Sequence, residues 1–129
     1  MIVDTSALVA VLTAQPERMA FLRLVRADSE VKVSAVTFFK FGMVVDRWKE
    51  PLVSRGVEPL LSLIEAEIVA VSADTARSAR EAYATFGKGN HPAKLNFGDC
   101  FAYALAKQTG ESLLFKGDDF AQTDVVSAV

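Results

Sequence analysis

The sequence has little of the chemistry that builds disulfides or histidine clusters. It contains one cysteine, Cys100, so no disulfide can form within the chain, and one histidine, His91. A lone thiol fits a reducing compartment and is expected to be a small core residue. His91 lies in the polar loop "GKGNHPAKLN", where we expect it to make a polar contact rather than to catalyse a reaction.

Long apolar runs and an excess of positive charge are also missing. No run approaches the ~20 apolar residues that span a bilayer, and the first residues, "MIVDTSALVAVL", lack the basic segment that begins a signal peptide. We therefore expect a cytoplasmic protein without a membrane partner. The formal net charge of -2 gives no overall basic field, so any binding of nucleic acid must rely on a local patch.

The chain is otherwise well supplied with core-forming residues. Its 129 residues are 51% hydrophobic and 23% charged, which is the size and composition of one domain with a sizeable core. No internal repeat or low-complexity stretch divides it. We expect residues 1–129 to form a single domain.

Apolar stretches of strand length alternate with stretches of helical period. Strands are expected at residues 1–5, 31–35, 68–72 and 112–115, and residues 125–129 are a candidate for a fifth. Helices are expected at residues 6–12, 17–27, 36–50, 58–67, 73–86 and 97–110. Strands separated by helices predict a parallel sheet of four or five strands with helices on both faces, an α/β/α sandwich of three layers.

Four aspartates lie where such a sheet would bring them together. Asp4 ends the first strand, Asp118 and Asp119 follow the fourth, and Asp99 opens a helix after a loop. The carboxyl ends of parallel strands face one crevice. Taken singly, each acid has a structural explanation, as a helix cap, a first-turn dipole partner or a turn residue.

Taken together, the acids favour a metal site. Carboxylates gathered in one crevice repel one another unless a cation offsets their charge. Hard oxygen ligands without thiolate or histidine partners favour Mg²⁺ or Mn²⁺ over Zn²⁺. The usual chemistry of such a site is phosphodiester hydrolysis.

Three stretches resemble the signature blocks of PIN-domain ribonucleases, and most closely those of the VapC toxins of toxin–antitoxin pairs. They are "MIVDTSALVAVL" at the start, "LNFGDCFAYALAK" at 95–107 and "LLFKGDDFAQTDV" at 113–125. The resemblance implies a PIN fold, a Mg²⁺-dependent endoribonuclease in which Mn²⁺ can substitute, a VapB-like antitoxin as partner, and a homodimer. Asp4 matches the first acid of the family and Asp99 the third, and Asp119 or Asp118 matches the fourth.

Lys40 stands where the family has its second acid, a glutamate. It lies in the apolar stretch "VSAVTFFKFG". An ammonium among the acids would replace a ligand and supply positive charge, but it cannot activate water as a metal does. The alternative is that Lys40 points away from the helix toward water. If Lys40 lies among the acids, catalysis is weakened or lost. A second hypothesis is then a catalytically silent PIN-fold module that binds RNA or antitoxin.

Other residues are expected to support these sites. Thr5, Ser6 and Asn96 flank the acids and could hold them or a metal-bound water, although they serve equally well as helix caps. Lys88 and Lys94 form a local basic patch that could approach an RNA backbone.

Two helical segments are expected to meet a partner. Residues 16–27 and the aromatic helix 36–49 carry more apolar surface than one small sheet can cover, which predicts a homodimer or an antitoxin complex. Antitoxin recognition would place a helix in a groove, with an arginine directed at the acids.

Overall fold

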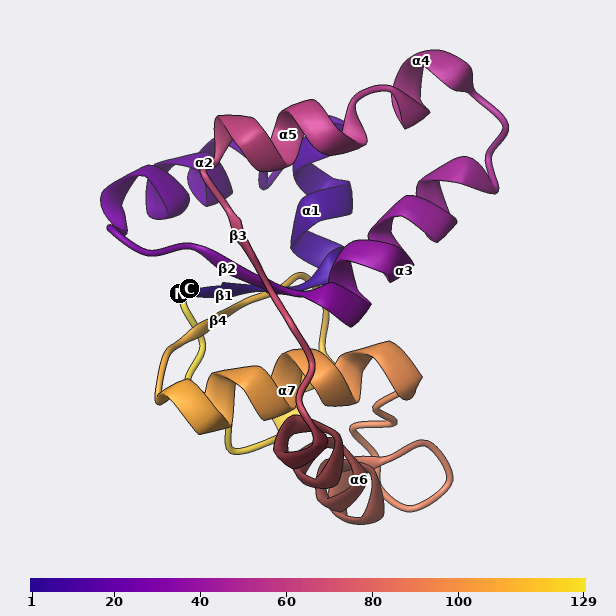
Figure 1. Cartoon of the computed structure of the whole chain (residues 1–129), viewed down its shortest axis with the longest axis vertical. Coiled ribbons are helices and arrows are strands. Elements are labelled where there is room, and N and C mark those ends of the chain that lie inside the picture. The colour runs from indigo at the N-terminus through magenta and orange to yellow at the C-terminus, as the bar shows by residue number, and fades with distance from the viewer.

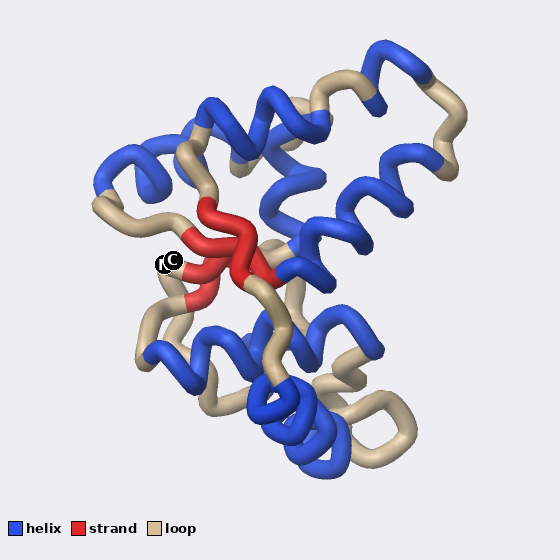
Figure 2. The backbone as a smooth tube through the Cα atoms, viewed as in Figure 1, coloured by secondary structure: helices blue, strands red, loops and turns tan.

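Four short parallel strands form the centre of the molecule. The computed structural model describes residues 1–129 and contains β1 (Ile2–Val3), β2 (Lys32–Ser34), β3 (Glu67–Val69) and β4 (Leu113–Leu114). They pair in the order β3-β2-β1-β4, and Figure 2 shows them between two groups of helices. The predicted α/β/α sandwich with a four- or five-stranded parallel sheet is confirmed, with four strands. Residues 125–129 add only one parallel bridge, between Leu113 and Ser127, instead of a fifth strand.

The helices form two layers, one on each face of the sheet (Figure 1). One layer contains α1 (Thr5–Leu12), α2 (Arg18–Ala27), α3 (Ala35–Asp46), α4 (Pro51–Ser54) and α5 (Val57–Leu63). The other contains α6 (Ala73–Phe86) and α7 (Phe97–Thr109), with a short 3₁₀ helix at Phe120–Gln122. None of these helices is both long and apolar enough to span a bilayer.

Alternation along the strands explains why both faces are covered. Val3 and Leu114 pack into the core beneath α1, α2 and α5, whereas Ile2 and Leu113 face the core formed with α6 and α7. Successive side chains of a strand point to opposite faces, so a strand that is apolar at every position needs helices on both sides. The near-continuous apolar sequences of β1 and β4 thus determine the three layers.

Helix ends follow local sequence signals. The side chains of Ser34 and Ser72 accept hydrogen bonds from the backbone at the starts of α3 and α6, and Gly110 ends α7 with a φ of +70°. Two predicted helix boundaries were wrong. The helix expected at 58–67 ends at Leu63, and Glu67 begins β3. The helix expected at 36–50 ends at Asp46, and Pro51 begins the separate short helix α4, because proline suits the first turn of a helix.

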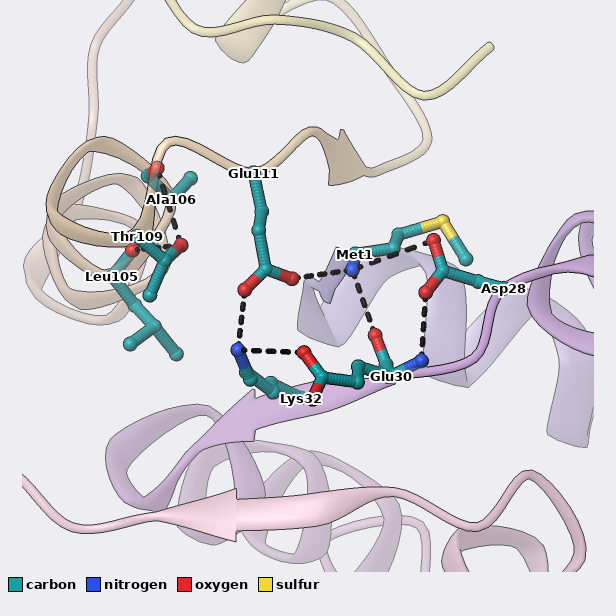
Figure 3. A network of polar contacts seen from close by, with 8 residues as sticks. All are labelled: Met1, Asp28, Glu30, Lys32, Leu105, Ala106, Thr109 and Glu111. Carbon is teal, nitrogen blue, oxygen red and sulfur yellow. Dashed lines mark hydrogen bonds and ion pairs between the residues drawn. The ribbon is translucent and has the colours of Figure 1, made fainter.

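A polar network lies at the amino-terminal ends of the strands (Figure 3). The carboxylate of Glu111 accepts a hydrogen bond from the Lys32 ammonium of β2 and another, at 2.5 Å, from the amino group of Met1. Burial raises the pKa of Glu111, but these two cations lower it by more, so the net pKa lies below the ordinary value. The network ties the segment before β4 to β1 and β2.

We predict a pH-dependent contribution of Glu111 to stability. Its pKa is lowered in the folded state, so the stabilisation is present above the ordinary value of about 4.5 and is lost as the pH falls through the folded-state pKa. Glu111→Gln should lower Tm by about 2–4 °C at pH 7, and the difference should shrink toward pH 3. Thermal unfolding across this range checks it, with Glu81→Gln on the exposed face of α6 as control. A pH-independent deficit would contradict the assignment.

Candidate active site

An open cleft of about 480 Å³ lies at the carboxyl ends of β1 and β4, bounded by α1, α3 and α7. The cleft is lined by Asp4, Thr5, Ser6, Val9, Gln15, Lys40, Val44, Asn96, Asp99, Lys116, Gly117, Asp119 and Phe120. We call it the acid cleft. Most of the residues singled out in the sequence meet here, although they come from four separate parts of the chain.

Asp4 is placed by the end of β1 and the start of α1. Its Oδ2 accepts hydrogen bonds from the Ser6 backbone N–H at 2.9 Å and from Ser6 Oγ at 2.7 Å, so it caps α1, while Oδ1 accepts none within the chain. The residue is only 3% exposed. Burial, and next the negative charge of Asp99, raise the pKa of Asp4 above its ordinary value, although the hydrogen bonds from Ser6 oppose this.

Asp99 is fixed by the first turn of α7. It forms a capping box with Asn96: Asp99 Oδ2 accepts from the Asn96 N–H, and Asn96 Oδ1 accepts from the Asp99 N–H. Asp99 is 5% exposed. The Asp99 side chain therefore both completes the capping box of α7 and lines the acid cleft, so its structural and functional explanations do not exclude each other.

Lys40 reaches from α3 into the acid cleft. Its Nζ lies 3.2 Å from Asp99 Oδ1 and 3.1 Å from Asn96 Oδ1. A Cβ on Gly98 would lie 2.5 Å from Lys40 Cδ, so the glycine leaves the space through which the lysine passes. The alternative in which Lys40 points away into water is not what the structure shows.

The loop after β4 places its two adjacent aspartates differently. Both are exposed, but Asp119 lines the acid cleft and Asp118 lies outside its lining. Lys116 and Gln15 also line the cleft, and sequence reasoning did not single them out. The backbone N–H of Lys116 donates to Ser6 Oγ at 3.0 Å, which ties this loop to α1.

The flanking polar residues divide into two kinds. Ser6 holds Asp4 and Asn96 holds Asp99, as the contacts above show. Thr5 does not bond an acid. Its Oγ1 donates to the Thr37 carbonyl at 3.5 Å, because α1 turns the hydroxyl toward α3. Thr5 therefore joins two helices.

The basic patch does not line the acid cleft. Lys88 and Lys94 line a polar hollow formed by the loop between α6 and α7, and neither forms an ion pair within the chain. His91 accepts a hydrogen bond from the Ala93 N–H at 3.0 Å and packs edge-on against Phe86. These contacts give His91 a structural place in the loop.

The residues present do not form a ready divalent metal site. No group of three or more acidic, histidine or cysteine side chains lies close enough to hold an ion together. Asp99 Oδ1 already pairs with the Lys40 ammonium, so this oxygen is not free to bind a metal. The cleft does offer two buried acids and one cleft-lining acid as oxygen ligands, so a divalent ion would fit once the Lys40 ammonium moves away from Asp99.

Comparisons with known proteins agree along the whole chain. The sequence profile of the PIN domain matches residues 1–126. Ribonuclease VapC30 of Mycobacterium tuberculosis is 44% identical over 128 residues, covering 98% of this chain and 97% of the relative. Ribonuclease VapC28 of the same species is 42% identical over 130 residues, covering 100% and 98%.

Solved structures show the same fold at lower sequence identity. The sarcin-ricin loop cleaving toxin VapC20 of Mycobacterium tuberculosis is 18% identical, with a TM-score of 0.77 over 97% of this chain and 95% of that one. VapBC2 of Rickettsia felis, solved bound to a DNA fragment from its promoter, is 14% identical, with a TM-score of 0.76 over 98% and 94%.

Proposed function

This chain belongs to the PIN-domain family and, within it, to the VapC ribonucleases, and we propose that it is the toxin of a toxin–antitoxin pair, an endoribonuclease that cleaves RNA phosphodiester bonds in the cytoplasm. The observation that carries the proposal is the pair of buried carboxylates, Asp4 and Asp99, in one open cleft at the carboxyl ends of the strands. Burying two acids in one cleft is costly, and uncharged residues such as asparagine or serine would cap helices without that cost.

Ribonucleases of this family depend on divalent metal ions, and we propose Mg²⁺ as the metal, with Mn²⁺ as a substitute. In nucleases such ions activate water and offset charge on the leaving oxygen. The proposed ligands are Asp4, Asp99 and Asp119. Because Lys40 holds Asp99 and places a positive charge in the cleft, we expect metal affinity, and with it cleavage, to be weak.

The chain's own residues have proposed roles that do not depend on the metal. Ser6 and Asn96 orient the two buried acids, and Asp4 Oδ1 remains free to accept a proton or a ligand. Lys40 and Lys116 line the same cleft and would attract a phosphate. Lys88 and Lys94 would hold the RNA backbone on one side of it.

The proposed protein partners are a VapB-like antitoxin and a second copy of this chain. Phe39, Met43 and Trp48 on and after α3 are 68%, 44% and 41% exposed, which supports the expectation that the aromatic helix meets a partner. The exposed Met19 on α2 adds to this apolar surface. A cleft that already contains the Lys40 ammonium should need an arginine from the antitoxin less.

A second candidate function is favoured by one specific contact. The Lys40–Asp99 pair and the lack of a preformed three-acid site suit a catalytically silent PIN domain that binds RNA or antitoxin without cutting. Such a chain would keep its RNA affinity and its partner, and it would show no cleavage at any metal concentration.

One cleavage assay tests both. Purified chain should cut total RNA slowly with millimolar Mg²⁺ or Mn²⁺, and a chelator should stop the reaction. Asp119→Asn should lower the rate roughly tenfold or more, since even residues behind metal ligands cost 10–100-fold. Asp118→Asn, a neighbour with the same change outside the cleft, should leave the rate near that of the unchanged chain.

The outcomes separate the two functions. No cutting by this chain or by its Lys40→Glu variant would overturn the ribonuclease proposal and leave the binding module. Equal effects of Asp119→Asn and Asp118→Asn would show that the loop contributes no specific ligand, and the assignment of Asp119 would then be wrong.

A further inference from the structure

An aromatic hollow of about 540 Å³ lies next to the acid cleft, between α6 and α7. It is lined by Ala76, Ala79, Arg80, Tyr83, Lys88, Asn96, Phe97, Cys100 and Phe101. Its size falls in the ~300–1,000 Å³ range of small-ligand sites. Neither the family assignment nor the ligands proposed above give it a use.

The rings at its surface are open. Phe97 is 75% exposed and Tyr83 is 45% exposed, which is unusual for large apolar side chains on packed helices. Phe97 and Phe101 have ring centroids 5.3 Å apart at 49°, so they do not cover each other face to face. A flat apolar ligand can therefore stack on them.

The hollow is held in shape by the loop beside it. Tyr83 donates its hydroxyl to the Lys88 carbonyl at 3.2 Å, and its own carbonyl accepts from the Gly87 N–H at 2.8 Å and from Asn90 at 3.3 Å. A surface that is already fixed loses little conformational entropy when a ligand binds.

Two shared residues make the hollow part of a longer track. Asn96 lines both the acid cleft and the aromatic hollow, and Lys88 lines both the aromatic hollow and the polar loop hollow. The carboxylates along the track are confined to the acid cleft, and the other two hollows carry only the cations Arg80, Lys88 and Lys94. Asn96, which belongs to both linings, has an Nδ2 that makes no hydrogen bond within the chain.

We infer that the aromatic hollow binds the unpaired base of a nucleotide next to the scissile phosphate, with the ring of Phe97 stacking on the base and with Arg80 and Lys88 on the adjoining phosphates. Single-stranded RNA is bound by this combination of aromatic rings and cations. A protein partner would also cover the rings, but the continuity with the acid cleft and the lining without acids favour a polyanion. The inference rests on the proposed ribonuclease function only for the position of the scissile phosphate.

Binding of short RNA in the presence of a chelator tests the inference without cleavage. The probes are a fluorescent six-nucleotide oligoadenylate and an abasic oligoribonucleotide of equal length and charge, measured by anisotropy. The chain should bind the oligoadenylate about tenfold or more tighter than the abasic probe. Phe97→Ala should abolish this difference, and Phe97→Tyr, which keeps a ring, should retain it.

Two further variants separate stacking from charge. Arg80→Ala should weaken binding of both probes alike and reduce the slope of log K against log salt by about one. Leu52→Ala removes an 81% exposed apolar side chain on the distant helix α4 and should change nothing.

The inference is overturned if Phe97→Ala retains the preference for the oligoadenylate. It is also overturned if Phe97→Ala loses RNA binding only together with a change in oligomeric state by sedimentation, because the hollow would then be a protein interface. Absence of cleavage by this chain and by its Lys40→Glu variant would overturn the ribonuclease proposal, yet it would leave these binding measurements intact.

Discussion

Lys40→Glu should bind Mn²⁺ far more tightly than the unchanged chain, with a rise of roughly 30-fold or more in affinity. Unit charges about 4 Å apart interact by about 4 kcal/mol at an effective dielectric of ~20. The Lys40 side chain is 24% exposed, so water screens part of that repulsion of the metal. Because Mn²⁺ carries two charges, the repulsion before this screening is about 8 kcal/mol. If a quarter remains, about 2 kcal/mol corresponds to roughly 30-fold, and the new carboxylate adds a ligand.

Titration calorimetry with Mn²⁺, paired with RNA cleavage, measures this effect. Lys40→Gln removes the charge without adding a ligand and should fall between the two. Lys49→Glu makes the same change in net charge just past the end of α3, outside the cleft, and should leave metal affinity almost unchanged. Equal affinity and equal cleavage for the chain and Lys40→Glu would mean that Lys40 does not oppose metal binding.

The sequence predicted the layers of the fold because short-range physics sets them. Strand-length apolar runs separated by amphipathic helices leave few arrangements besides a parallel sheet covered on both faces. The error at residues 36–50 has a local cause: the helical pattern continues past Asp46, and only the chain turn before Pro51 divides it. Residues 125–129 have strand composition but pair through one bridge, since length and composition do not determine pairing.

The acid cleft was predictable where a residue follows a strand or begins a helix. Asp4 and Asp99 occupy such positions, and the same geometry that caps α1 and α7 directs them to one edge. Which of Asp118 and Asp119 lines the cleft depends on the path of a loop after Gly117, whose φ is +103°, and no periodic pattern encodes that path. The aromatic hollow was missed because Tyr83 and Phe97 are distant in sequence and meet only through the packing of α6 on α7.

Asp4→Asn should produce a protein that is more stable than the unchanged chain but has lost cleavage. The pKa of Asp4 is raised in the folded state by burial and by Asp99, which means that folding disfavours its charged form at neutral pH. Lys40 bonds Asp99 rather than Asp4, so the Asp4 charge has no directly bonded cation. An asparagine keeps a side-chain oxygen to accept from Ser6 and cap α1 while it removes the buried charge.

We expect Asp4→Asn to raise the free energy of unfolding by about 1 kcal/mol, a typical gain when a functional site gives up an unfavourable group. The same change removes the only carboxylate oxygen of the buried pair that makes no hydrogen bond within the chain, so cleavage should fall by roughly a hundredfold or more. Thermal and urea unfolding at pH 7, with cleavage measured on the same preparations, test both halves. Asp118→Asn is the matched control, because it removes an exposed carboxylate and should alter neither quantity. If Asp4→Asn is less stable than the unchanged chain, the charge of Asp4 stabilises α1 by more than burial and the charge of Asp99 oppose it.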